Sequence, residues 1–471
     1  MELDQLKALL SDYEKLKEAI YREKVFIYGE GLEKYFEICD NEYDIKLHAI
    51  NDTSIRPNKV ITMDSGTMQS PVTRIPVPYQ KKIVELATTF LLGNPVTISA
   101  KPLNDTETNM LNMLTKVWND NKLDYEGQKL AESVFRLTEC AELWYAEEAP
   151  PDYWKGTPIE GSKTRLRYML LSRLKGDALY PVFNSKGDMI AFGRQYTLRV
   201  NGEPEMHFDI YTDTQNYFSV KQTSTGAASG WDVKPEVNIL GKIPVVYYYK
   251  KYTEWHDVQP MIDRYEKSVS NHGDNNDYFG SPMIVVKGAI KGFAKKGEAG
   301  KLLELENGAE AAYLESNTAP ESIKLEQDNL KDLIHDMSDT PHISFEEVQG
   351  IGKLSGIALK LLFMGAHMKA SKNETVIGLG FQRRLNFLKT ALTKISVKLE
   401  PALAMSVKPV FDFFLPKDDE AYVNMLNVAT GAKATLSQKT AVGLSPLVSD
   451  PDAELADILS EGLNDQQNAG L

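Results

Sequence analysis

The stretch with the clearest capacity for chemistry is the glycine-rich loop "QGIGKLSG" at 349–356, which holds one lysine, Lys353, and leads into an apolar helical pattern. Loops of this kind often cradle nucleotide phosphates. Two positions depart from that pattern: Glu347 stands where the first glycine is required, and Leu354 where a Ser or Thr would bind magnesium. Because helices are expected on both sides, a dinucleotide-binding unit with its preceding strand is also disfavoured. The pattern therefore argues against a nucleotide site.

Other candidates for catalysis or metal binding are scattered along the chain. None of the histidines has a metal-ligand spacing to a cysteine or to another histidine. They are His48, His207, His256, His272, His335, His342 and His367. The chain contains no G-x-S-x-G nucleophile motif, and the spacing of its carboxylates singles out no catalytic pair. The sequence therefore predicts a protein that is not an enzyme and uses no metal or cofactor.

Positive charge is densest between residues 287 and 301. This run contains Lys287, Lys291, Lys295, Lys296 and Lys301. A basic run is most often a solvated turn, and its functional interpretation is a docking surface for an acidic partner. The residues alone leave both interpretations open.

Composition bounds the class of protein. The chain has 471 residues, 42% of them hydrophobic, and a net charge of −13, which suggests about three domains with ordinary cores. Proteins that grip nucleic acid tightly by its phosphates are usually basic, so tight, sequence-independent DNA binding is disfavoured. A surface that lets a polyanion pass without adhering is still compatible with this charge.

The compartment follows from the cysteines and the apolar runs. Cys39 and Cys140 are expected to be reduced, buried thiols. No apolar run approaches the roughly 18 residues of a membrane span, and the acidic N-terminal pattern lacks the features of a signal peptide. The expectation is a soluble protein made in a cytoplasm.

The elements expected around these residues alternate between helical and strand-rich blocks. Apolar spacing predicts helices within 78–95 and over 104–120, 124–140, 257–279, 319–338 and 356–400, and three short helices at 418–429, 436–447 and 451–462. Short β-type runs fill 142–250, and 281–318 holds two strand-like runs around a basic turn. Gly273 and its polar neighbours weaken the 257–279 pattern on propensity, and Gly378 and Gly380 should kink the long helix.

Several segments resemble portal proteins of tailed bacteriophages, in the siphophage-type branch. They are "KKIVELATTFLLGNPVTISA" at 81–100, "DVQPMIDRYEKSVSN" at 257–271, "SGIALKLLF" at 355–363 and "LSQKTAVGLSPLVSDPDAELADI" at 436–458. These segments occur in the order that the family shows. The resemblance extends over about residues 80–463.

The resemblance implies an α+β, mainly α portal fold with a wing, a helical stem, a small β-containing clip and a helical C-terminal crown. The implied division is a wing at 1–254, with its β-rich block at 142–250, stem helices at 255–280 and 319–339, a clip at 281–318, a tunnel loop and long kinked wing helix at 340–405, and a crown at 406–471.

The resemblance also implies a function without an active site. Such a ring, by analogy a dodecamer, would stand at one capsid vertex as the conduit for double-stranded DNA. Its partners would be the terminase large subunit, major capsid and scaffolding proteins and a head-completion adaptor, first in the host cytoplasm and then in the virion. Gln349, Lys353 and Ser355 would belong to a tunnel loop near DNA, and Lys291, Lys295 and Lys296 to the docking surface. The alternatives are another capsid-associated adaptor ring and a nucleotide-dependent enzyme.

Overall fold

The computed structural model describes most of the chain. The described residues are 12–29, 31–63, 66–221, 231–279, 284–288, 290–293, 303–305, 308, 310–313, 320–342, 361–414, 419–431, 434–445, 447–448 and 450–468. They fall into two compact units, the first made of residues 1–340 and 368–413 and the second of residues 341–367 and 414–471.

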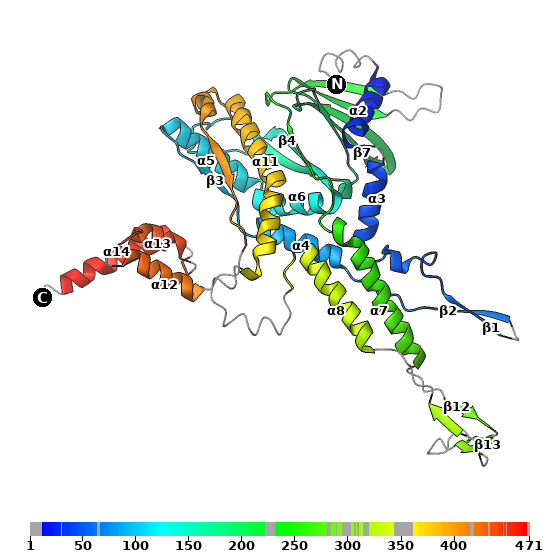
Figure 1. Ribbon diagram of the computed structural model, residues 1–471. Coiled ribbons are helices and arrows are strands. Elements are labelled where there is room, and N and C mark those ends of the chain that lie inside the picture. The colour runs from blue at the N-terminus through cyan, green and yellow to red at the C-terminus, as the bar shows by residue number, and fades with distance from the viewer. Residues whose placement is uncertain are drawn as a thin grey trace. The chain divides into compact units, whose positions relative to one another are not determined.

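The first unit begins with helices and one hairpin (Figure 1). In chain order the elements are α2 (Tyr13–Tyr28), α3 (Leu32–Tyr43), η1 (Ala49–Asn51), β1 (Lys59–Met63), β2 (Gly66–Ser70), α4 (Tyr79–Leu92), β3 (Thr97–Ala100), α5 (Asp105–Asp120) and α6 (Leu123–Leu137). The start of α5 shows how local sequence sets a boundary: the Asn104 side chain accepts a hydrogen bond from Glu107 N at 2.9 Å, and Glu107 accepts one from Leu103 N at 2.7 Å. The helix predicted at 104–120 is confirmed, and the one predicted at 124–140 is present but ends at Leu137, because β4 begins at Glu139.

A block of antiparallel strands follows. It comprises β4 (Glu139–Glu148), β5 (Thr164–Leu171), η2 (Arg173–Lys175), β6 (Ala178–Phe183), β7 (Met189–Val200), β8 (Glu203–Tyr211), β9 (Gln215–Lys221), β10 (Trp231–Val237) and β11 (Val245–Tyr249). They form a five-stranded sheet in the order β10-β9-β8-β7-β6 and a three-stranded sheet in the order β11-β4-β5. Leu16 and Ile20 of α2 are buried against Val182 and Phe208 of the larger sheet. The predicted strand-rich block is therefore confirmed.

The next elements are two long helices and two small ribbons. After η3 (His256–Val258) come α7 (Gln259–Phe279), β12 (Ile284–Lys287), β13 (Ile290–Phe293), β14 (Leu303–Leu305), β15 (Glu310–Tyr313) and α8 (Pro320–Met337). β12 pairs with β15 and β13 with β14. The two predicted strands are present as β12 and β15. Lys291, which was predicted to begin the basic turn, lies instead within a further strand, β13.

The long helix α11 (Met364–Ile395) is continuous across Gly378 and Gly380. A Cβ atom on Gly380 would lie only 1.9 Å from the Tyr248 ring. The glycine therefore lets α11 approach β11 closely. The kink expected at these glycines stays a prediction. η4 (Val397–Ala404) and β16 (Val407–Val410) follow, and β16 pairs with β3 across more than 300 residues of sequence.

The second unit contains the three predicted C-terminal helices, α12 (Asp419–Thr430), α13 (Gln438–Leu444) and α14 (Pro451–Asn468). Ser437 caps α13 by accepting a hydrogen bond from Thr440 N at 3.2 Å. Asp450 caps α14 in the same way, from Ala453 N at 3.1 Å. These short polar side chains satisfy backbone groups that the first helical turn leaves without a partner.

Candidate DNA-channel and docking elements

Helices α7 and α8 form a long helical pair in the first unit. The helices pack side by side, and Arg264 of α7 pairs with Glu326 of α8 through Nε–Oε1 at 2.8 Å (Figure 1). Tyr79 of α4 lies between them at their upper end, with its ring centre 5.7 Å from that of Tyr265 and 5.8 Å from that of His335. At 1.5 Å per residue, α7 is about 32 Å long and α8 about 27 Å.

The second half of α7 anchors the base of the β1–β2 hairpin. Arg56 donates hydrogen bonds to Asn271 Oδ1 at 2.8 Å, to Asp274 Oδ2 at 2.7 Å and to the Thr73 carbonyl at 3.1 Å. Thr73 in turn donates its backbone N–H to Asp274 at 2.6 Å and its hydroxyl to Asp277 at 2.9 Å. The polar residues that weakened the helical pattern in the sequence are therefore those that hold the hairpin.

Electrostatics reinforce this base. Partial burial opposes the charge of Asp274, but the hydrogen bonds from Thr73 and the charges of Lys59 and Arg56 hold the pKa of Asp274 below its usual value. A Cβ on Gly273 would meet Thr73 Cγ2 at 2.8 Å, so glycine is required for this approach. One signal in the sequence was available: a polar cluster, "NHGDNND", inside an otherwise periodic helix.

The body of the first unit contains a fully buried ion pair. Arg384 of α11 donates from Nε to Glu142 Oε2 of β4 at 2.8 Å, and both side chains are inaccessible to solvent. Burial alone disfavours the guanidinium charge, but Glu142 outweighs it and raises the pKa of Arg384. Tyr248 and Trp144 also donate hydrogen bonds to Glu142, and the Phe381 ring centre lies 3.9 Å from the guanidinium carbon. This cluster joins α11 to the three-stranded sheet.

A second buried carboxylate, Glu254, links the end of the strand block to α11. It pairs with Lys250 and, at 3.1 Å, with Lys369. Burial tends to raise the pKa of Glu254, but the two lysines hold it below its usual value. The carboxylate is therefore ionised at neutral pH and fixes α11 beside β11.

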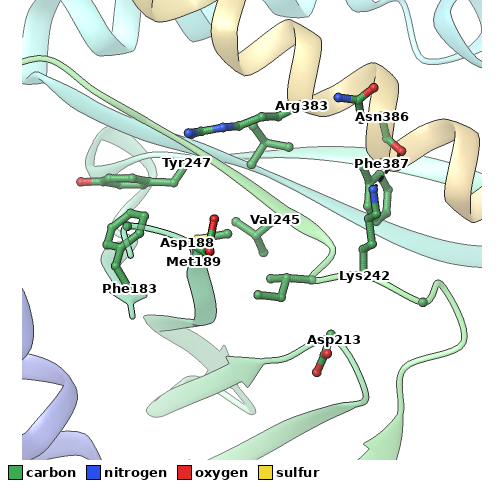
Figure 2. A pocket seen from close by; sticks show the side chains of 14 residues that line it. Phe183, Asp188, Met189, Asp213, Lys242, Val245, Tyr247, Arg383, Asn386 and Phe387 are labelled. Carbon is green, nitrogen blue, oxygen red and sulfur yellow. Dashed lines mark hydrogen bonds between the residues drawn. The ribbon is translucent and has the colours of Figure 1, made fainter. Parts of the chain in front are cut away.

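A cavity of about 540 Å³ lies where the β6–β7 turn faces α11 (Figure 2). Buried Val245, Tyr247 and Phe387 form part of its wall. Its charged residues are Asp188, Asp213, Lys242 and Arg383. The Lys242 ammonium donates to the Asn386 carbonyl at 3.5 Å. Because acidic and basic groups are balanced, the electrostatics select neither an anion nor a cation, and we assign this cavity no ligand.

The sequence-predicted site residues fall mostly outside the described part of the chain. Gln349, Lys353 and Ser355 lie outside it, as do Lys295 and Lys296. Lys291 lies in β13. Cys39 and Cys140 are free and buried, which confirms that prediction.

Among the residues that the structure describes, no group of three or more His, Cys, Asp or Glu side chains is arranged to hold a metal ion. The helices in the same residues include none that is long and apolar enough to cross a membrane.

Comparison with known proteins identifies the class. The family described as "Phage portal protein, SPP1 Gp6-like" matches residues 8–468. The "Portal protein" of Bacillus phage SPP1 is 21% identical over 453 residues, which cover 90% of this chain and 82% of that protein. A chain in the solved structure "Neck of empty GTA particle computed with C6 symmetry" is 13% identical, with a TM-score of 0.38, over 79% of this chain and 90% of that chain.

The match to the family spans almost the whole chain, so the protein belongs to the SPP1 Gp6-like family of phage portal proteins. This family is structural rather than enzymatic, and the chain functions as a portal protein, the head-to-tail connector of a bacteriophage. The resemblance inferred from the four sequence segments is confirmed.

Proposed function

We propose that the chain forms a ring of about twelve copies at one capsid vertex, with α7 and α8 lining a channel for double-stranded DNA. In this proposal 255–280 and 319–339 are the stem, 281–318 the clip, 1–254 and 340–405 the wing with its tunnel loop, and 406–471 the crown. The observation that carries the proposal is the long α7–α8 pair, whose connecting segment contains the small ribbons β12–β15 and β13–β14.

The charge of these helices suits a channel through which DNA moves. α8 contains Glu321, Glu326, Asp328, Asp332 and Asp336 against Lys324 and Lys331. Strong phosphate binding would hold a polyanion in place, whereas an acidic wall repels it and keeps contacts weak. Lys353, which lies outside the described residues, would then supply one cation per subunit within the tunnel loop together with Gln349 and Ser355.

The ring is tested by native mass spectrometry combined with averaged electron micrographs of the purified protein. We expect a ring of about twelve subunits with a central hole. A monomer or dimer at high protein concentration would contradict the proposal. Measurement of ATP hydrolysis on the same sample addresses the nucleotide-dependent enzyme, which requires turnover that Lys353→Ala abolishes.

The tunnel loop is tested by Lys353→Ala in a packaging reaction. We expect ring assembly to be unchanged and DNA packaging or retention to be altered, because the substitution removes a phosphate contact and no structural one. Lys324→Ala on α8 is the matched control for removal of a lysine elsewhere in the stem. Failure of Lys353→Ala to form rings would show that the lysine is structural.

The clip lysines are proposed to contact the packaging motor, the terminase large subunit, and later the head-completion adaptor, while capsid and scaffolding proteins contact the wing. Charge reversal at Lys291, Lys295 and Lys296 should weaken motor binding, because these side chains would then repel an acidic partner. The measurement is co-sedimentation of rings with the motor subunit. Charge reversal at Lys324 and Lys331 serves as the control, and equal loss from both sets would contradict the assignment.

A further inference from the structure

The β1–β2 hairpin exposes open strand edges and apolar side chains that no other part of the described chain covers. Among the strands that the structure describes, β1 and β2 pair only with each other, so each leaves one edge open. Val60, Ile61 and Met68 are 64%, 40% and 52% exposed. An isolated two-stranded hairpin is at best marginally stable in water and normally needs an apolar surface to pack against.

The base of the hairpin is nevertheless held firmly. Glu266, Ser270, Asp274 and Asp277 of α7 each accept a hydrogen bond from the segment that follows the hairpin, residues 73–77. Their spacing of three to four residues places them along one face of the helix. The base of the hairpin, here called its root, is therefore attached to α7 by these hydrogen bonds.

A second exposed apolar surface lies on α8. Leu325, Leu333 and Met337 are 62%, 43% and 57% exposed, and their spacing puts them on one broad face of the helix. Ile334 lies on another face and is fully buried. The exposed face is therefore separate from the face that packs in the body of the unit.

The apolar side chains of the hairpin and of this face of α8 are all exposed within one chain, so neither surface covers the other there. In Figure 1, α7 stands between α8 and the hairpin. The root contacts on α7 exclude Arg264, which pairs with α8. The hairpin therefore does not reach the exposed face of α8 in its own chain.

We propose that the β1–β2 hairpin of one subunit packs against the exposed face of α8 in the next subunit. This inference rests on the proposed ring. A contact between two different patches of the same kind of subunit is heterologous, the kind that closes into a ring when repeated by rotation. Charge favours the same pairing: the strands carry one charged residue, Lys59, which is basic, and α8 has an excess of carboxylates.

The alternative occupant is the hairpin of a second copy, related by a two-fold axis. That contact would be isologous and would give a dimer in place of a ring. The two cases differ in which residues of two copies meet, and this difference can be measured directly.

Disulfide trapping in the full-length chain tests the contact, since native Cys39 and Cys140 are fully buried and should not react. We expect Met68→Cys combined with Leu333→Cys to give a ladder of covalent oligomers on a non-reducing gel. Leu325→Cys or Met337→Cys can replace Leu333→Cys to allow for register. Met68→Cys combined with Leu103→Cys, another highly exposed position, is the matched control and should give no ladder.

Each outcome is informative when the same samples are examined by native mass spectrometry. Rings without a ladder at any of the three α8 positions overturn the hairpin contact but leave the proposed ring intact. A covalent dimer from Met68→Cys alone indicates the isologous contact and also overturns the inference. A ladder without closed rings supports the contact and counts against the ring. The absence of both overturns both.

A second variant measures the strength of the contact. Val60→Asp with Ile61→Asp should raise the protein concentration needed for half-assembly at least tenfold, because it places charge in an apolar interface. The melting temperature of the unassembled subunit should not change, since both side chains are already exposed. Unaltered assembly would contradict the proposal.

Discussion

Two regions of the first unit differ in which side chains they bury: the body, and the surface formed by the β1–β2 hairpin and α8. In the body, Glu142 and Arg384 are charged, fully buried and matched to each other. On the surface formed by the β1–β2 hairpin and α8, apolar side chains such as Met68 and Leu325 are exposed. Buried charges are tolerated only when paired, so the body is complete within one chain. In the proposed ring, another copy covers this exposed apolar surface.

The largest expected effect comes from breaking the buried pair. Arg384→Met leaves Glu142 buried and unpaired, which should lower the free energy of unfolding by about 3–5 kcal/mol. The measurement is denaturant unfolding of the subunit. Arg383→Met, at the exposed neighbouring position, should change stability by no more than about 0.5 kcal/mol. Similar losses in the two variants would contradict the role of the pair.

The next effect concerns the approach of α11 to β11. Gly380→Ala drives a methyl group into the Tyr248 ring, so we expect a loss of about 1–3 kcal/mol in unfolding free energy. Leu379→Ala, an exposed position on the same helix, should alter stability by only a few tenths of a kcal/mol. If Gly380→Ala were neutral, the glycine would not be required for packing.

A smaller and local effect is expected at the root of the hairpin. Arg56→Ala removes three hydrogen bonds, one of them to a carboxylate, and should lower the local opening free energy of residues 59–70 by about 1.5 kcal/mol. Hydrogen exchange of the hairpin amides should then accelerate about tenfold. Lys59→Ala, whose ammonium lies 3.9 Å from Asp274, is the control and should have little effect. Acceleration throughout the unit would indicate global destabilisation.

The smallest effect is a pH dependence at the same root. Because the pKa of Asp274 is lowered by folding, its stabilisation is fully present above the ordinary Asp value of 3.8 and is lost as the pH falls through the folded pKa. The difference in unfolding free energy between wild type and Asp274→Asn should therefore stay constant from pH 5 to 7 and shrink below about 3.8. A difference that does not change with pH would show that charge is not involved.

The sequence by itself determined the family and most of the local structure. Apolar spacing predicted the helices α5 and α6 and the start of α14 at residue 451, because these features depend on neighbours a few residues away. The four segments that resemble portal proteins were sufficient to identify the class. The proposed roles of Lys353 and of the clip lysines stay predictions.

Tertiary structure alone decided which distant residues meet. β3 and β16 are more than 300 residues apart in the sequence, and only the fold pairs them. From the sequence alone, Gly380 predicted a kink in the long helix, and the polar residues around Asp274 predicted a low helix propensity for the second half of α7. In the structure the glycine makes room for Tyr248 and the aspartate binds Arg56. A single sequence predicts the local propensity of each residue for helix or strand. The role of a residue with unfavourable propensity depends on the side chains that pack against it, and these are set by long-range contacts.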